Sequence, residues 1–124
     1  MFALSAVLTS LLLLEVVPSA LAALTRFGPG VERLDSLTRL GLREGRAAWV
    51  VPAAGVLHSL ATAALLAGIW HPAWGAAGAA AEALFFGWVL FRQLRAGDRG
   101  KVLFAYGLFT SWSVLVLLVA ALRL

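Results

Sequence analysis

The sequence predicts an all-α integral membrane protein: a four-helix bundle with a short interfacial amphipathic segment between helices 1 and 2. Of its 124 residues, 62% are hydrophobic and only 13% are charged, whereas ordinary soluble domains carry roughly 25% charged residues. A soluble domain of this size would leave much of that apolar surface in water. The hydrophobic residues also fall into four stretches, each close to the ~20 residues that cross a hydrocarbon core.

The four expected helices cover residues 2–24, 47–69, 72–94 and 102–122, within a single domain of residues 1–124. Only Trp70 and His71 join the second stretch to the third. Pro72 then stands in the first turn of the following helix, where its missing N–H costs nothing. We therefore expect a tight helical hairpin. The third and fourth stretches are joined by "RAGDRGK", residues 95–101, a polar loop whose two glycines both break a helix.

The first stretch has an alternative interpretation as a secretory signal peptide. "SALA", residues 19–22, has the small residues of a cleavage site. However, no Lys or Arg precedes the apolar run, and Glu15 interrupts it. We therefore expect a membrane helix that is retained.

Residues 25–46 form the longest polar segment, and part of it has helical periodicity. The stretch "VERLDSLTRLGL" places apolar residues on one side and polar residues around the other, and Gly41 offers a stop. The apolar side consists of Val31, Leu34, Leu37 and Leu40, and the polar side of Glu32, Arg33, Asp35, Ser36 and Arg39. This pattern predicts a short helix in the membrane interface. A solvated loop with chance periodicity is the alternative, because the periodic run is short.

The basic residues predict the orientation of the chain. Nine of them lie in or beside the segments 25–46 and 95–101, namely Arg26, Arg33, Arg39, Arg43, Arg46, Arg92, Arg95, Arg99 and Lys101. Only Arg123 lies at the opposite side. By the positive-inside rule, both segments are expected to be cytoplasmic, with both termini outside. The net charge of +4 is thus interpreted as a topology signal, and no nucleic-acid partner is expected.

A layer of polar residues is expected near the bilayer centre. At ~1.5 Å per residue from the expected cytoplasmic ends, all four helices bring a polar side chain to a similar depth. Acids at this depth are costly, so they normally face the bundle interior and find partners. The candidate site for a ligand or protons consists of Glu15, His58, Glu82, Tyr106, Thr110 and Trp112. For Trp112, a wall of the same pocket and a lipid-facing position are both open.

Two interpretations of this layer remain open. The layer is either a hydrogen-bonded plug that fixes helix register, or a buried site for protons, a quinone head group or another small ligand. A metal site is not expected, because the chain lacks the Glu-x-x-His pairs of carboxylate bundle sites. The chain has no cysteine, no nucleophile–base pair and no phosphate-binding loop. No catalytic residue is therefore assigned, and no cofactor is expected beyond a quinone or lipid.

Glu15 carries a further expectation. All basic residues are expected near the membrane boundaries, away from this carboxyl group, and apolar surroundings disfavour a carboxylate. We expect Glu15 to be mostly protonated at neutral pH. Its expected hydrogen-bond partner is His58 or a hydroxyl group of the last helix.

Residues 54–98, "AGVLHSLATAALLAGIWHPAWGAAGAAAEALFFGWVLFRQLRAGD", resemble helices two and three of the DoxX-like family of small four-helix bacterial membrane proteins. The similar features are "LATAALLAG", a turn that contains proline, and an Ala-rich helix that ends in "RAGD". Where that family tends to have a glutamate in helix two, this chain has His58. The resemblance implies a bacterial inner-membrane protein, sometimes tied to redox or quinone chemistry or to a larger complex, often without known activity of its own.

Two functions follow as hypotheses. The first is an accessory subunit of a membrane complex. Its expected partners are the lipid bilayer and either other membrane proteins or a second copy of the chain. An exposed seam of small residues on the third helix is expected to serve that contact: Gly75, Ala79, Ala83 and Gly87. The alternative is a small proton-coupled transporter that uses Glu15, similar to the small multidrug resistance family. The long segment 25–46 and the strong basic asymmetry count against that alternative.

Overall fold

The computed structural model describes residues 2–25, 28–38 and 49–124, and in these ranges the chain is helical, with no strand. The elements are α1 (Phe2–Leu24), α2 (Gly28–Thr38), α3 (Val50–Gly68), α4 (Pro72–Arg95), the 3₁₀ turn η1 (Gly100–Leu103) and α5 (Phe104–Leu122). Four helical segments are long and apolar enough to cross a membrane: Phe2–Leu24, Val50–Gly68, Pro72–Arg95 and Gly100–Leu122. The all-α prediction is therefore confirmed for the described residues, and the four segments indicate a multi-pass membrane protein.

The predicted helix bounds differ from the observed ones mainly at two N-termini. The second long helix begins at Val50 rather than at residue 47, and residues 47–48 lie outside the described ranges. A start at Val50 places Pro52 in the first turn, where a missing N–H breaks no helical hydrogen bond. The last long helix begins with η1, and its α-helical part starts at Phe104.

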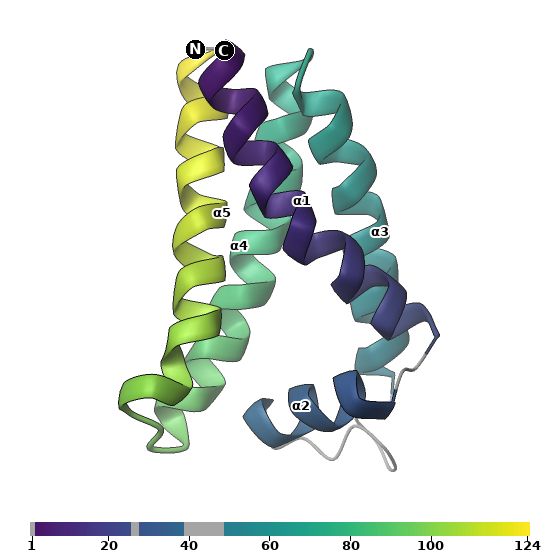
Figure 1. The fold of residues 1–124 in the computed structure, drawn as a ribbon, viewed down its shortest axis with the longest axis vertical. Helices are drawn as coiled ribbons and strands as arrows, with labels where there is room; N and C mark the ends of the chain where they lie inside the picture. The colour runs from purple at the N-terminus through teal and green to yellow at the C-terminus, as the bar shows by residue number, and fades with distance from the viewer. Residues whose placement is uncertain (1, 26–27, 39–48) are drawn as a thin grey trace.

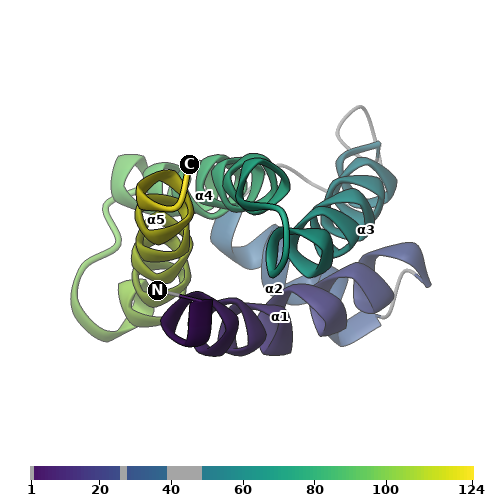
Figure 2. The same ribbon diagram turned by 90° about the horizontal axis from the view of Figure 1, so that it is seen from above.

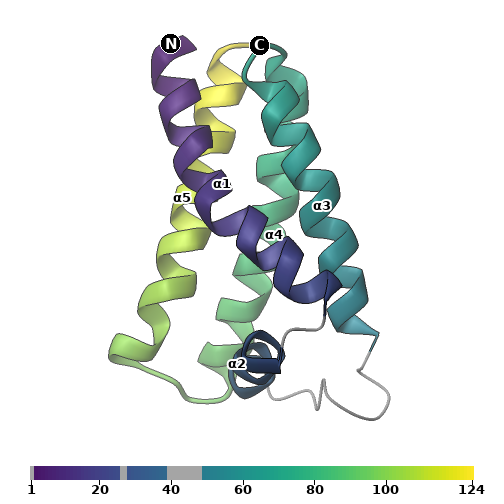
Figure 3. The ribbon, with the colours of Figure 1, turned by 45° about the vertical axis from the view of Figure 1, so that its right-hand side comes forward.

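The four long helices run lengthwise, and the two ends of the chain lie at the same end of the bundle (Figure 1). Viewed from that end, the helices follow one another around the bundle in the order α1, α3, α4 and α5 (Figure 2). Helix α2 lies across the opposite end, and Figure 3 shows it end-on beneath the long helices. We call the two ends of the bundle the terminal end and the α2 end.

Close packing is concentrated toward the terminal end. The buried core there contains Leu8 and Leu12 of α1, Leu65 of α3 and Val116 of α5. At the α3–α4 hairpin the backbones themselves touch, because a Cβ on Gly68 would overlap the backbone of Gly75. Small residues allow helices to approach this closely in lipid.

The expectation of an exposed small-residue seam on α4 is wrong for Gly75 and Ala79, which are buried, while Ala83 and Gly87 are half-buried. Gly75 packs against Gly68, Ala79 is fully buried, and a Cβ on Gly87 would meet the methyl group of Thr110 in α5. Residues four positions apart share one helical face, and here that face turns toward the inside of the bundle. The seam therefore serves packing between α4 and its own neighbours.

Arg123 joins three helices at the terminal end. Its guanidinium donates to Ser5 Oγ of α1 at 2.8 Å, to the carbonyl of Ile69 at 3.0 Å and to the carbonyl of Gly68 at 3.3 Å. The last carbonyls of a helix have no partner within the helix. Arg123 therefore satisfies the C-terminal carbonyls of α3 and ties them to α1 and α5.

At the α2 end a second arginine performs a similar task. Arg92 of α4 donates its Nε and Nη2 hydrogens to the carbonyl of Thr38, the last residue of α2, at 3.0 and 2.9 Å. Val31 of α2 is buried and Leu34 is half-buried. A short helix is thus confirmed over residues 31–38 of the predicted stretch and begins three residues earlier, at Gly28, while residues 39–42 lie outside the described residues.

The connection from α4 to α5 uses both of its glycines. Gly97 and Gly100 have φ angles of 91° and 75°, a region that residues with a Cβ rarely occupy. The amide of Gly97 donates to the carbonyl of Leu94, and the amide of Asp98 donates to the carbonyl of Gln93. This pair of bonds is the Schellman arrangement that ends a helix at a glycine, here Gly97. The sequence predicted a break in the helix at this loop.

Candidate functional site

The half of the bundle toward α2 contains a cavity of about 160 Å³. Helix α1 starts beside α5 and diverges from it toward the α2 end (Figure 1). Side chains from α1, α3, α4 and α5 form the walls, and Val31, Arg33 and Leu34 of α2 close the end. The polar lining consists of Glu15, Ser19, Arg33, His58 and Tyr106, and the aromatic lining also includes Phe85 and Phe109.

Pro18 lies in α1 between the cavity residues Glu15 and Ser19. Proline has no N–H to donate to the carbonyl four residues earlier, which is that of Leu14. A helix with one missing hydrogen bond bends more readily at that turn. Pro18 therefore weakens α1 at the level where it leaves α5 and lines the cavity.

His58 and Glu82 form a buried pair between α3 and α4. Nδ1 of His58 lies 2.8 Å from Oε1 of Glu82, and both side chains are almost completely excluded from solvent. The imidazole ring is also held by Phe85, edge to face at 4.6 Å, and by Phe86, stacked at 5.8 Å. With Nδ1 engaged, Nε2 is the ring nitrogen that remains for a ligand, and His58 lines the cavity.

Glu82 itself does not line the cavity. Its side chain is fully buried behind His58, and Oε2 has no hydrogen-bond partner among the described residues. A carboxyl group behind a histidine fixes the position and the tautomer of the ring. We therefore interpret Glu82 as a positioning residue for His58.

The prediction that Glu15 bonds to His58 or to a hydroxyl group of the last helix is wrong. Its Oε1 accepts a hydrogen bond from Ser19 Oγ at 3.0 Å, one turn further along the same helix. Glu82 already occupies His58, and residues four apart on a helix are neighbours. The protonation state of Glu15 stays a prediction.

The expectation that all basic residues lie away from Glu15 is also wrong, because of the position of Arg33. It lines the same cavity, within electrostatic range of both Glu15 and Tyr106. Helix α2 crosses the end of the bundle, so Arg33 lines the cavity although much of its side chain is exposed. The amphipathic pattern of residues 31–42 was the signal that could have located Arg33, because it predicted the helix that carries it.

The remaining predicted site residues lie on α5, and only one of them lines the cavity. Tyr106 does so, with its ring against Phe86 at 5.8 Å and Phe109 at 5.5 Å. Thr110 donates to the carbonyl of Tyr106 in its own helix and lies outside the lining. Trp112 lies in a separate groove between α1 and α5, where its Nε1 donates to the carbonyl of Leu8 at 3.0 Å.

The cavity thus combines Glu15, His58 and Tyr106 with residues that the sequence did not single out as a site, above all Arg33, Phe85 and Phe109. Among the described residues, no three His, Cys, Asp or Glu side chains are grouped to hold a metal ion. A carboxyl group, an imidazole, a guanidinium and a phenol offer both donors and acceptors. Such a set suits a small ligand with polar atoms on an otherwise apolar ring.

Comparison of the chain with protein-family models, with curated proteins and with solved structures finds no match. The resemblance to the DoxX-like family therefore rests on the residues quoted from 54–98.

Proposed function

We propose that this chain is a DoxX-like integral membrane protein of the bacterial inner membrane whose cavity binds the head group of a quinone. In this proposal it acts as an accessory subunit of a membrane redox complex and has no catalytic activity of its own. The observation that carries the proposal is the cavity, in which polar groups from four helices face aromatic walls. Buried ionisable residues of membrane helices commonly mark functional sites.

The size of the cavity favours a single ring. Its volume is about 160 Å³, and an apolar protein cavity of roughly 150 Å³ binds benzene. A quinone head group is one ring with two carbonyl oxygens, both of which accept hydrogen bonds. Arg33 and the hydroxyl of Tyr106 supply donors, and the rings of Phe85 and Phe109 supply apolar contact.

The distribution of charge supports the proposed orientation. Arg33, Arg92, Arg95, Arg99 and Lys101 lie on α2, at the end of α4 and in the turn before α5. Arg123 lies at the other end, where it caps α3. The α2 end is therefore proposed to face the cytoplasm, and the terminal end the outside.

Quinone binding is tested with a probe that has no side chain, 2,3-dimethoxy-5-methyl-1,4-benzoquinone, titrated into the protein in mild detergent. We expect Tyr106→Phe to weaken binding by about tenfold, because one hydrogen bond is lost while the ring remains. Thr110→Val, one turn away and outside the lining, is the control and should bind like the wild type. Extraction from native membranes, followed by mass spectrometry, should recover a quinone and a protein partner. Unchanged binding by Tyr106→Phe, with no quinone recovered, would sink the proposal.

A proton-coupled transporter of the small multidrug type is the second candidate. The observation that favours it is the position of Glu15, which lines both the cavity and the groove between α1 and α5. A carboxyl group that reaches two separate spaces could exchange protons for a substrate. Glu15→Gln should then abolish proton-coupled uptake and drug resistance in whole cells. Unchanged resistance would remove this candidate and leave the quinone proposal standing.

A further inference from the structure

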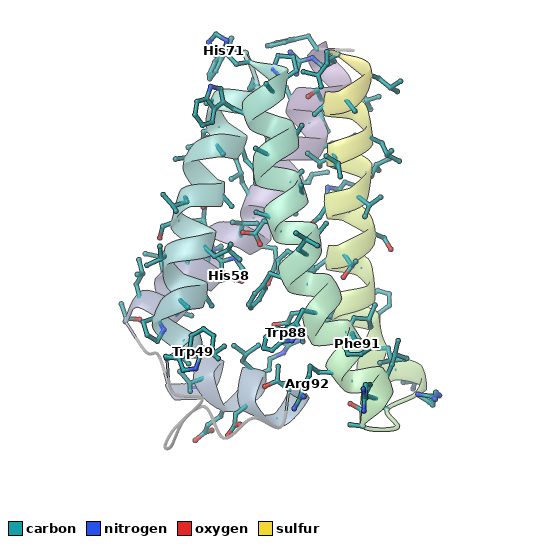
Figure 4. All side chains as sticks on the ribbon, turned by 180° about the vertical axis from the view of Figure 1, so that it is seen from behind. Trp49, His58, His71, Trp88, Phe91 and Arg92 are labelled. Carbon is teal, nitrogen blue, oxygen red and sulfur yellow. The ribbon has the colours of Figure 1, made fainter. Side chains whose placement is uncertain are left out.

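A second space lies directly beside the cavity, on the outer side of α3 and α4. This α3–α4 groove has a volume of about 560 Å³ and is lined by Trp49, Ala53, Leu57, Trp88 and Arg92, among others. Figure 4 shows Trp49 and Trp88 on the two sides of the opening, with Arg92 below them and His58 above. The side chains that line the groove are mostly apolar. The exception is Arg92, which directs Nε and Nη2 to the carbonyl of Thr38.

The groove and the cavity share two wall residues among those that the structure describes. Ala54 and Phe85 line both spaces. Ala54 contributes a single methyl group. The ring of Phe85 lies between His58, at 4.6 Å, and Trp88, at 6.0 Å. Phe85 is therefore part of the wall between the groove and the cavity.

The sizes of the residues along the hairpin explain why the opening is at this end. Near the terminal end α3 and α4 meet through Gly68 and Gly75, whose backbones touch. Near the α2 end the facing residue on α4 is Trp88, and Arg92 is occupied with α2. Helices separated by small residues pack closely, and bulky residues hold them apart. The hairpin therefore widens toward the α2 end.

We infer that the ligand is an amphiphile whose single-ring head occupies the cavity and whose apolar chain leaves between Ala54 and Phe85 into the α3–α4 groove. This inference rests on the proposed quinone function and adds the chain and its route. A cavity of about 160 Å³ has room for one ring but not for a long chain as well. The chain must therefore cross the wall of the bundle, and the groove offers it the apolar side chains of Ala53, Leu57 and Trp88.

Another space that borders the cavity, the α1–α5 groove, is less suitable for a chain. The groove between α1 and α5 is smaller, about 250 Å³, and the residues that it shares with the cavity are Glu15 and Phe109. A chain that left on this side would pass against the carboxyl group of Glu15 and strip it of polar contacts, which costs free energy. Among the described residues, none that lines the α3–α4 groove has a carboxyl group.

The test compares the side-chain-free quinone named above with its decyl-substituted analogue, by titration of the whole protein in mild detergent. Ala53 is exposed and lines the groove but not the cavity, so Ala53→Trp fills the groove from outside. We expect this variant to bind the decyl probe about tenfold more weakly than the wild type does, since buried methylene groups lose their contacts. Its affinity for the side-chain-free probe should stay within about twofold of the wild-type value.

Ala63→Trp is the matched control, because Ala63 is also exposed on α3 but lines a different groove. It should bind both probes like the wild type. If Ala53→Trp leaves the decyl affinity unchanged while the wild type still binds the side-chain-free probe, the chain route is wrong and the head-group site stands. Selective loss of the decyl probe in Leu108→Trp, within the α1–α5 groove, would also overturn the route. If the wild type binds neither probe, the quinone proposal itself fails.

Discussion

At the scale of single residues, the structure assigns different tasks to the two carboxyl groups within the long helices, those of Glu15 and Glu82. Glu82 is fully buried and holds His58, whereas Glu15 is partly exposed, bonds to Ser19 and lines the cavity. The two groups lie on helices that approach the cavity from different sides. Glu82 is therefore expected to matter for stability, and Glu15 for whatever occupies the cavity.

The stability of the His58–Glu82 pair is testable by substitution. Glu82→Leu leaves Nδ1 of His58 buried without a partner, and an orphaned buried donor costs about 1 to 3 kcal/mol. We expect a lower midpoint of thermal unfolding, followed by circular dichroism in detergent. The double variant His58→Phe with Glu82→Leu should lose less stability than the sum of the two single variants, because no polar group is left unpaired. Additive losses would show that the two residues are not coupled.

At the scale of elements, the α3–α4 hairpin depends on backbone contact between two glycines. Gly68→Ala places a Cβ against the backbone of Gly75, and a backbone cannot move aside as a flexible side chain can. Overpacking of this kind costs about 1 to 3 kcal/mol. We expect a clear fall in the thermal midpoint.

Gly107→Ala is the control for this substitution, because a Cβ at Gly107 has open space around it. Within a helix, alanine is more favourable than glycine by roughly 0.5 to 1 kcal/mol. The control should therefore leave the midpoint unchanged or raise it slightly. Equal destabilisation by both variants would contradict the role assigned to the Gly68–Gly75 contact.

A second prediction at this scale concerns how α2 is attached to the bundle. It is held to α4 by the two hydrogen bonds from Arg92 to the carbonyl of Thr38. Arg92→Gln should loosen α2 and speed amide hydrogen exchange in residues 31–38 by about tenfold, since two bonds contribute roughly 1 to 3 kcal/mol together. Arg95→Gln, an exposed position on the same helix, is the control. Unchanged exchange in the Arg92 variant would mean that the packing of Val31 alone holds α2.

At the scale of the whole molecule, the bundle is tight at one end and open at the other. Arg123 and the Gly68–Gly75 contact close the terminal end. At the α2 end α1 diverges from α5, and α2 covers the space that results (Figure 1). A tilted first helix and a crossing short helix thus create the cavity together.

The orientation of the whole molecule is directly testable, because the chain has no cysteine of its own. Ser36, His71 and Lys101 are exposed, so single cysteines at these positions should be tolerated. In intact cells a membrane-impermeant maleimide should label His71→Cys, while Ser36→Cys and Lys101→Cys should react only after permeabilisation. Labelling of Ser36→Cys and His71→Cys under the same condition would refute the proposed topology.

The local features of the fold could be predicted from the sequence. Predominantly apolar runs of about 20 residues, bounded by Pro72, Gly97 and Gly100, located the long helices to within a few residues of the observed bounds. The spacing of Val31 and Leu34 also predicted the short helix. These signals depend on neighbours along the chain, because helical hydrogen bonds join residues four apart and proline and glycine end a helix locally. No knowledge of packing was needed to use them.

The pairing of the polar residues was decided only by the tertiary structure. Depth along a helix placed Glu15, His58 and Glu82 at one level, but it could not say that His58 pairs with Glu82 while Glu15 bonds to Ser19. Partner choice depends on the rotation and tilt of whole helices, which packing of the entire bundle determines. For the same reason the sequence did not show that Arg33 lines the cavity, since this depends on the position of α2 across the end of the bundle. Local sequence determines where each helix begins and ends, whereas contacts between distant segments determine which side chains meet.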